Sequence, residues 1–139
     1  MQALQSTQVR KNMGGFIDNV VREKPQVVRR NRDVIVATSQ KDMLFFLKPY
    51  ELHFEYEIDE DGRYAGSIKE IEFIVGDGAS LEELRLELAY QLLDYAQEYN
   101  ENYPEYFNAP NTKNHAPFVI RLLLEDDIQS IAKFLKIKA

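Results

Sequence analysis

Side chains able to bind nucleic acid are concentrated near the start of the chain, in two short groups. An arginine guanidinium offers a planar fork of donors to phosphate oxygens or to a guanine edge, and an asparagine amide can pair with adenine. The candidate residues are Arg10, Lys11, Asn12, Arg29, Arg30 and Arg32. Their types and spacing predict a surface that binds duplex DNA. A solvated basic face without a ligand is the alternative.

The net charge changes sign along the chain. Residues 1–48 contain nine Lys and Arg against four Asp and Glu, a net charge of +5, and residues 49–139 contain eight against nineteen, a net charge of −11. Such an asymmetry between two halves indicates two kinds of partner, because an acidic surface steers basic partners toward it. Chance segregation of solvated charge, which serves only solubility, is the alternative.

Tyrosines recur among carboxylates in the acidic part of the chain. The four that lie in a stretch rich in Tyr, Asn, Glu and Pro are Tyr95, Tyr99, Tyr103 and Tyr106. Amphipathic aromatic side chains are enriched in the cores of protein interfaces. The pattern therefore predicts that this stretch contributes to the contact with a basic protein partner.

Motifs for catalysis or for metal binding are missing from the sequence. It has no cysteine, no nucleophile elbow, no P-loop and no dinucleotide-binding glycine motif. The acidic stretch 59–62 resembles the start of a calcium-binding loop, but Ile68 stands where a bidentate glutamate is needed. His53 and His115 are the only histidines, and two histidines would need carboxylates to hold a metal. We therefore predict no enzyme activity, no catalytic residue, no metal and no cofactor, with a carboxylate pair in acid/base catalysis as the alternative.

The composition is that of a globular protein of one mid-sized domain or two small ones. Hydrophobic residues make up 45% of the chain and charged residues 29%. No apolar run approaches the roughly 18 residues needed to cross a bilayer, and the N-terminus lacks the apolar core of a signal peptide. We therefore expect a cytoplasmic protein without a membrane partner.

The elements expected in residues 1–48 are a helix, a hairpin and a second helix. The first helix begins at Ser6, which can cap it, and ends before Pro25. Its apolar residues recur at helical spacing, at Met13, Ile17, Val20 and Val21. Extended runs at 26–30 and 34–38 flank turn residues and predict a β-hairpin. A short helix over 40–48 follows it.

A second set of elements is expected after Pro49. Strands are predicted over 52–58, 63–68, 71–75 and 118–124, the last as a buried fourth strand. Ser80 predicts the start of a long helix, because Glu83 completes a capping box. The stretch 95–110 is expected to include the longest loop. A final helix begins at Asp126 or Asp127.

The order of short motifs in the first third carries a resemblance. The run at 6–13 is followed by Ile17 and Val20, Pro25, Val27 and Val28, Arg30, the apolar run 34–37 and the run 39–43. In this order and spacing, residues 4–48 resemble the Phd/YefM family of antitoxins. Val9, Arg29 and Asp33 depart from the residues usual in that family.

The resemblance to the Phd/YefM family implies several functional properties. Residues 1–48 would pair into a dimer whose basic surface binds operator DNA, the protein would repress its own operon, and its C-terminal part would bind a toxin. By position, Arg10 and Arg30 match the arginines that face DNA in that family, and Lys11, Asn12 and Arg32 are their neighbours.

The acidic part of the chain carries a second resemblance, on residues 54–56, 59–64, 68–71 and 76–84. Residues 52–98 are similar to the HicB-type antitoxin domain, in which three antiparallel strands precede a helix. This resemblance implies that the domain occludes a small basic ribonuclease toxin, which the charge of −11 suits.

The sequence thus predicts an α+β chain. A helix–hairpin–helix unit at 1–48, for dimerisation and DNA binding, precedes an acidic antiparallel-sheet domain with a long helix at 49–139, which is the candidate toxin-binding domain. The expected protein is the antitoxin of a type II toxin–antitoxin system, a homodimer or higher oligomer that neutralises a small basic toxin and represses its own operon. The alternative is a transcriptional regulator whose acidic domain serves sensing or oligomerisation.

Overall fold

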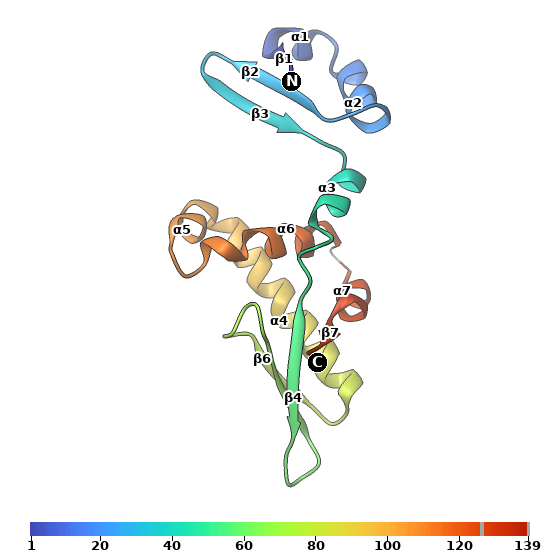
Figure 1. The fold of residues 1–139 in the computed structure, drawn as a ribbon, viewed down its shortest axis with the longest axis vertical. Helices are drawn as coiled ribbons and strands as arrows, with labels where there is room; N and C mark the ends of the chain where they lie inside the picture. Colours follow the sequence, from blue (N-terminus) through green and yellow to red (C-terminus); the bar gives the residue numbers. More distant parts are fainter. Residues whose placement is uncertain (126, 139) are drawn as a thin grey trace. The chain divides into compact units, whose positions relative to one another are not determined.

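A computed structural model describes residues 1–125 and 127–138. Helices and two separate sheets form two compact units, Met1–Phe46 and Leu47–Ala139, which we call the first and the second unit (Figure 1). The expected α+β class is confirmed. The division falls two residues before the boundary set from the sequence, and the roles assigned to the two parts stay predictions. No helix in the described ranges is both long enough and apolar enough to cross a bilayer.

The first unit is built on a three-stranded sheet (Figure 1). Its elements are β1 (Ala3–Gln5), α1 (Ser6–Lys11), α2 (Met13–Arg22), β2 (Gln26–Arg30), β3 (Asp33–Ala37) and α3 (Gln40–Leu47). The central strand β2 pairs in parallel with β1 and antiparallel with β3. The expected hairpin is therefore confirmed, and β1 is an additional strand that was not predicted from the sequence.

Local side-chain chemistry accounts for the hairpin turn and for the start of α3. Asn31, in the two-residue turn, has a φ of 57°, a left-handed conformation that asparagine adopts more readily than most residues. The Ser39 hydroxyl accepts a hydrogen bond from the Asp42 amide at 3.1 Å and thereby satisfies a free donor of the first turn of α3.

The single helix expected from Ser6 is wrong. The chain forms two helices that are separated at Asn12, and Gln5 rather than Ser6 caps the first. The Asn12 side-chain oxygen accepts a hydrogen bond from the Gly15 amide at 3.0 Å and so begins α2. A Cβ at residue 15 would lie 2.5 Å from the Asn12 side-chain nitrogen, so a larger residue there would displace the capping side chain.

The second unit has a four-stranded sheet and a long helix. Its elements are β4 (His53–Ile58), β5 (Tyr64–Ile68), β6 (Val75–Gly78), α4 (Leu81–Glu101), α5 (Tyr103–Asn108), the 3-10 turn η1 (Lys113–His115), α6 (Ala116–Glu125), α7 (Ile128–Phe134) and β7 (Lys136–Ile137). The strand order is β6-β5-β4-β7. The antiparallel pairing expected for the first three strands is confirmed, whereas β7 lies parallel to β4.

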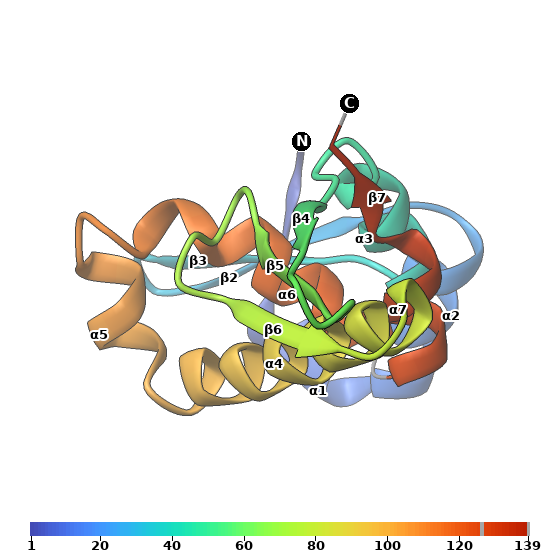
Figure 2. The same ribbon diagram turned by 90° about the horizontal axis from the view of Figure 1, so that it is seen from below.

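The core of the second unit is organised by α4. The helix begins as predicted, because the Ser80 hydroxyl accepts from the Glu83 amide and the Glu83 carboxylate accepts from the Ala79 amide. Its buried residues recur at helical spacing, at Leu84, Leu88, Leu92, Tyr95 and Tyr99. Figure 2 shows α4 along one face of β5 and β6, and α6 and α7 pack against the same helix.

The strand expected over 71–75 is wrong. Ile71 and Ile74 are buried in a turn, and strand β6 follows at Val75–Gly78. A Cβ at Gly76 would lie 2.9 Å from the Glu87 side chain, and a Cβ at Gly78 would lie 2.6 Å from a backbone nitrogen of α4. Gly76 and Gly78 are thus points where helix and strand approach each other closely.

Two further expectations about the second unit are wrong. The run 118–124 belongs to α6, whose buried residues Ala116, Val119 and Leu122 recur every three positions, so the run is helical. The stretch 95–110 is largely helical as well, because α4 continues to Glu101 and α5 follows. The fourth strand of the sheet is β7. Asp127 caps the last helix, and Asp126 lies outside the described residues.

Candidate nucleic-acid and protein interfaces

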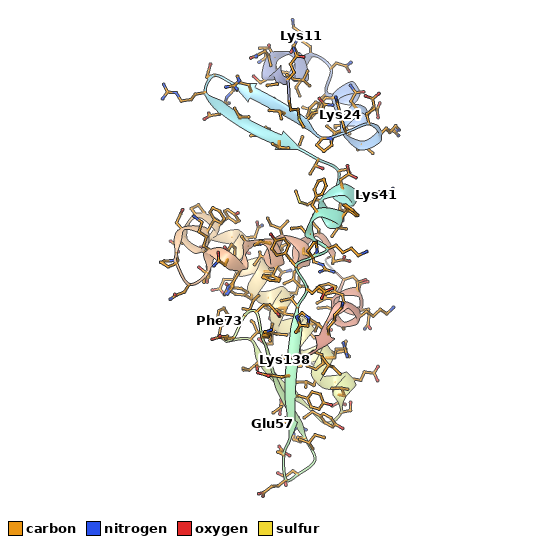
Figure 3. The ribbon with its side chains drawn as sticks, viewed as in Figure 1. Lys11, Lys24, Lys41, Glu57, Phe73 and Lys138 are labelled. Carbon is orange, nitrogen blue, oxygen red and sulfur yellow. The ribbon has the colours of Figure 1, made fainter. Side chains whose placement is uncertain are left out.

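The six residues predicted to bind DNA all lie on the surface of the first unit. Arg10 and Lys11 lie in the last turn of α1, Asn12 lies between the two helices, Arg29 and Arg30 end β2, and Arg32 lies in the turn. Figure 3 labels Lys11 on α1. All six side chains are therefore accessible to a ligand.

The parallel pairing of β1 with β2 connects the two basic groups. Gln5 pairs with Arg29, and α1 begins at the next residue, so α1 starts beside the arginine-bearing end of β2. Consecutive strand residues point to opposite faces, which places Arg29 and Arg30 on different sides of the sheet. Arg30 and Asp33 lie 3.8 Å apart and are both well exposed, so this ion pair holds the guanidinium only weakly.

Asn12 has a structural role that bears on its predicted contact with adenine. A bidentate contact with adenine uses the side-chain oxygen and nitrogen together. The oxygen already accepts from the Gly15 amide at the start of α2. A base contact must therefore share or replace the cap of α2.

Apolar side chains remain uncovered on the first unit. On β3, Val34, Ile35 and Val36 are 48%, 61% and 65% exposed, and because neighbouring residues alternate, both faces of this edge strand are open. The other exposed apolar residues of the unit include Met13, Ile17, Val21, Phe45 and Phe46. Of the apolar stripe expected on the first helix, only Val20 is buried. Patches of this kind mark interaction surfaces.

The four tyrosines predicted to contact a toxin differ in burial. Tyr95 is 6% exposed and Tyr99 is fully buried, and both belong to the core. The Tyr99 hydroxyl donates to the Thr112 carbonyl at 2.9 Å. Tyr103 and Tyr106 are half-buried. In this conformation Tyr95 and Tyr99 support the helices from within, and only Tyr103 and Tyr106 offer surface to a partner.

Burial shifts the titration of this aromatic cluster. It raises the pKa of the Tyr95 hydroxyl, with smaller contributions from Tyr99, Tyr106 and Glu98. The Tyr95 hydroxyl lies 2.7 Å from His115 Nδ1, and burial lowers the pKa of that imidazole. The neutral forms of both groups are therefore favoured, and their hydrogen bond joins α4 to η1. Glu70 and Glu72 line a cleft of about 380 Å³ beside His115.

The other histidine and the acidic turn have structural partners. The Glu70 carboxylate accepts from the His53 backbone amide at 2.6 Å and lies 2.8 Å from His53 Nδ1. Asp59 accepts from the amides of Asp61 and Arg63 and thus organises the turn between β4 and β5. Among the described residues, no group of three or more His, Cys, Asp or Glu side chains is arranged to hold a metal ion.

Comparisons with known proteins identify relatives of the whole chain. Residues 1–137 match the profile of a family named PHD_like, described as antitoxin of toxin–antitoxin, RelE/RelB. A solved structure from Syntrophomonas wolfei subsp. wolfei, described as an antitoxin part of a proposed toxin/antitoxin system, is 36% identical. It superposes with a TM-score of 0.91 over 99% of each chain. No curated protein matches the chain significantly.

Proposed function

The chain belongs to the PHD_like family of toxin–antitoxin antitoxins, and from this membership we propose that it neutralises a toxin protein and represses its own operon, as a type II antitoxin does. The observation that carries the proposal is the extent of the match, which spans both units. One function must then account for a basic first unit and an acidic second unit.

The first unit is the proposed operator-binding part. Its six candidate residues are exposed, and the start of α1 lies beside the arginine-bearing end of β2. Exposed guanidinium groups on two adjacent elements can contact phosphates along one groove and base edges within it. The Phd/YefM-like motifs in residues 4–48 agree with this role.

The first unit also carries the proposed homodimer contact. A 46-residue unit buries too little surface to be very stable alone, and its edge strand β3 exposes three consecutive apolar side chains. A second copy that covers this surface would bring two basic surfaces together. A symmetric dimer of this kind matches a palindromic operator.

The second unit is the proposed toxin-binding part. It is folded and strongly acidic, so it would bind a basic toxin through a preformed surface and accelerate the encounter electrostatically. The HicB-like order of strands and helix supports this assignment. Neutralisation by occlusion requires binding alone, so we propose that the protein acts in the cytoplasm without catalysis or a cofactor.

Co-expression tests the toxin-binding part of the proposal. The full chain is expressed with the product of the neighbouring reading frame, one partner carrying an affinity tag, and growth and co-purification are measured. We expect growth arrest by the neighbouring product alone, rescue by this chain and a stable complex. Growth arrest that persists in the presence of this folded chain would contradict the proposal.

Operator binding is tested with a double variant and a matched control. Arg10→Glu with Arg30→Glu should weaken binding to the operon's promoter at least a hundredfold and reduce the slope of log affinity against log salt by roughly 2. Lys24→Glu with Lys41→Glu changes the charge equally, on exposed residues outside the predicted surface (Figure 3). This control should retain most of the affinity. Equal losses in both variants would indicate a general charge effect and would contradict the assigned surface.

A further inference from the structure

One face of the sheet in the second unit is covered by α4, and the opposite face is open. The covered face includes Gly66, Gly76 and Gly78, at which an added Cβ would clash with β4 or with α4. The open face is formed by the alternate residues of the same strands, in two cross-strand rows. These rows are Glu57–Ala65–Asp77 and Glu55–Ser67–Val75.

The open face has the shape of a trough. Each row places a small residue of β5, Ala65 or Ser67, between larger side chains of β4 and β6. These residues line a depression of about 780 Å³ that is open to solvent, together with Glu87 at the β6 side. The floor is thus wide enough to admit side chains of a partner, and the rims are acidic.

The carboxylates along the trough are either unpaired or weakly paired. The Glu55 carboxylate lies 3.3 Å from Lys138 Nζ, and Asp77 accepts two hydrogen bonds from the Arg63 guanidinium at 3.0 and 3.2 Å. All four side chains are 41–63% exposed, so water screens both pairs and an incoming cation can displace them. Within the described ranges, the Glu57 carboxylate has no ion-pair partner. Figure 3 labels Glu57, on β4, and Lys138, which directly follows β7.

An exposed apolar side chain lies on the same face. Val75 on β6, which ends the row Glu55–Ser67–Val75, is 59% exposed. The strand β6 is also the edge of the sheet, so the backbone groups along its outer side are unpaired by any other strand of the sheet. The surface therefore combines negative charge with apolar area, which a purely solvated face does not need.

We propose that this trough, formed by Glu55, Glu57, Ala65, Ser67, Val75 and Asp77, is the surface that binds the toxin. The occupant is a segment of a basic protein that carries Arg or Lys side chains next to apolar ones. The cations replace Arg63 and Lys138 at the rim carboxylates and pair with Glu57, and the apolar side chains cover Val75. This inference rests on the proposed antitoxin function, and charge complementarity selects the partner.

The test uses the full chain and the purified product of the neighbouring reading frame. Glu57→Lys reverses the unpaired charge, and Ala65→Arg fills the floor of the trough at an exposed position. Glu101→Lys is the matched control, because Glu101 is exposed at the end of α4, away from the trough. Dissociation constants are measured by calorimetry, and thermal melting verifies that each variant folds. We expect at least a tenfold weakening for the two trough variants and no more than a twofold change for the control.

Each other outcome overturns the inference in a recognisable way. Equal binding by all variants would leave the antitoxin function intact and exclude the trough. If the Tyr103→Ala variant lost toxin binding while the Glu57→Lys variant bound as tightly as the wild type, the contact would lie on the half-buried tyrosines. If Glu57→Lys changed only the self-association of the chain and not its binding to the toxin, the trough would be a contact between two copies of the chain. Failure of the wild-type chain to bind would overturn the proposed function together with this surface.

Discussion

His115 makes the stability of the second unit depend on pH. Burial lowers the pKa of its imidazole, whereas in the unfolded chain the pKa is about 6.5. As the pH falls through about 6.5, the unfolded chain therefore takes up a proton that the folded chain resists, and the free energy of unfolding decreases. The contribution of His115 to the free energy of unfolding is complete above the pKa of the unfolded chain and is lost on acidification. Between about pH 7.5 and pH 5, the melting temperature of the wild type should therefore fall further than that of the His115→Asn variant.

The other titrating groups are present in both proteins, so their effect on stability cancels when the wild type is compared with His115→Asn. Glu70 and Glu72 line the cleft beside the ring and would favour its charged form, an effect that opposes burial and is included in the difference. Melting is followed by tyrosine fluorescence, because all eight tyrosines lie in the second unit. Parallel pH profiles for the two proteins would show that His115 is not responsible.

Two glycines should respond in opposite ways to the same substitution. A Cβ at Gly78 would lie 2.6 Å from the backbone nitrogen of Leu84, which cannot move without α4, so Gly78→Ala should destabilise the second unit by roughly 1–3 kcal/mol. Nothing lies within 4 Å of a Cβ at Gly14, near the start of α2. Gly14→Ala should stabilise the first unit by roughly 0.5–1 kcal/mol.

Urea denaturation measures both free energies of unfolding. Tyrosine fluorescence follows the second unit, and circular dichroism at a helix wavelength follows both. Tolerance of alanine at residue 78 would mean that α4 does not approach β6 as closely as described.

Residue-scale features were predictable from the sequence where a side chain acts on its neighbours. Ser80 with Glu83 and the turn at Asn31 could be found because their hydrogen bonds span a few residues. The burial of Tyr99 could not, since it depends on the Thr112 carbonyl and on helices that pack from elsewhere in the chain. The prediction of a tyrosine surface depended on the prediction of a loop over 95–110, and that stretch is largely helical.

At the scale of elements, β7 is short but closes one side of the sheet. The Lys136 amide donates to the Leu52 carbonyl at 3.0 Å and the Lys138 amide to the Phe54 carbonyl at 2.8 Å. Truncation after Leu135 should remove both bonds, cost roughly 1–3 kcal/mol and leave β4 as an open edge. Hydrogen exchange should then accelerate in β4, and the protein should aggregate more readily.

A control separates the backbone pairing of β7 from its side chains. Lys136→Ala with Lys138→Ala removes the ion pairs with Glu51 and Glu55 but keeps the strand. Because exposed ion pairs contribute at most about 1 kcal/mol each, this variant should keep slow exchange in β4. Fast exchange in the control would assign the effect to the ion pairs.

The elements predicted wrongly share a physical cause. The apolar run 118–124 is compatible with a buried strand or a buried helix, and only its partners, α4 above all, select the helix. Strand β1 pairs with β2 across more than twenty residues of chain, and its three residues carry no alternation that would reveal it. The hairpin and α3 were predictable because their contacts and caps are local.

At the scale of the whole molecule, the exposed apolar surface of the first unit predicts self-association. Val36→Glu places a charge on β3, at a side chain that is 65% exposed, and should shift the mass found by light scattering at micromolar concentration from dimer to monomer. The cost of burying an unpaired carboxylate would prevent the contact. Val75→Glu, at a valine of the second unit that is 59% exposed, should leave the dimer intact. A monomeric wild type would contradict the prediction.

The pairing of β7 with β4 also sets the order in which the two units can complete their folds during synthesis. β4 begins the second sheet and β7 completes it, so that sheet stays open until the residues of β7 have been added. At about 5–20 residues per second, the second unit takes roughly 5–20 s to synthesise after the first is finished. Each nascent chain therefore presents its arginine-bearing unit seconds before its acidic unit can close. A chain released early would carry the proposed operator contacts without the finished partner-binding half.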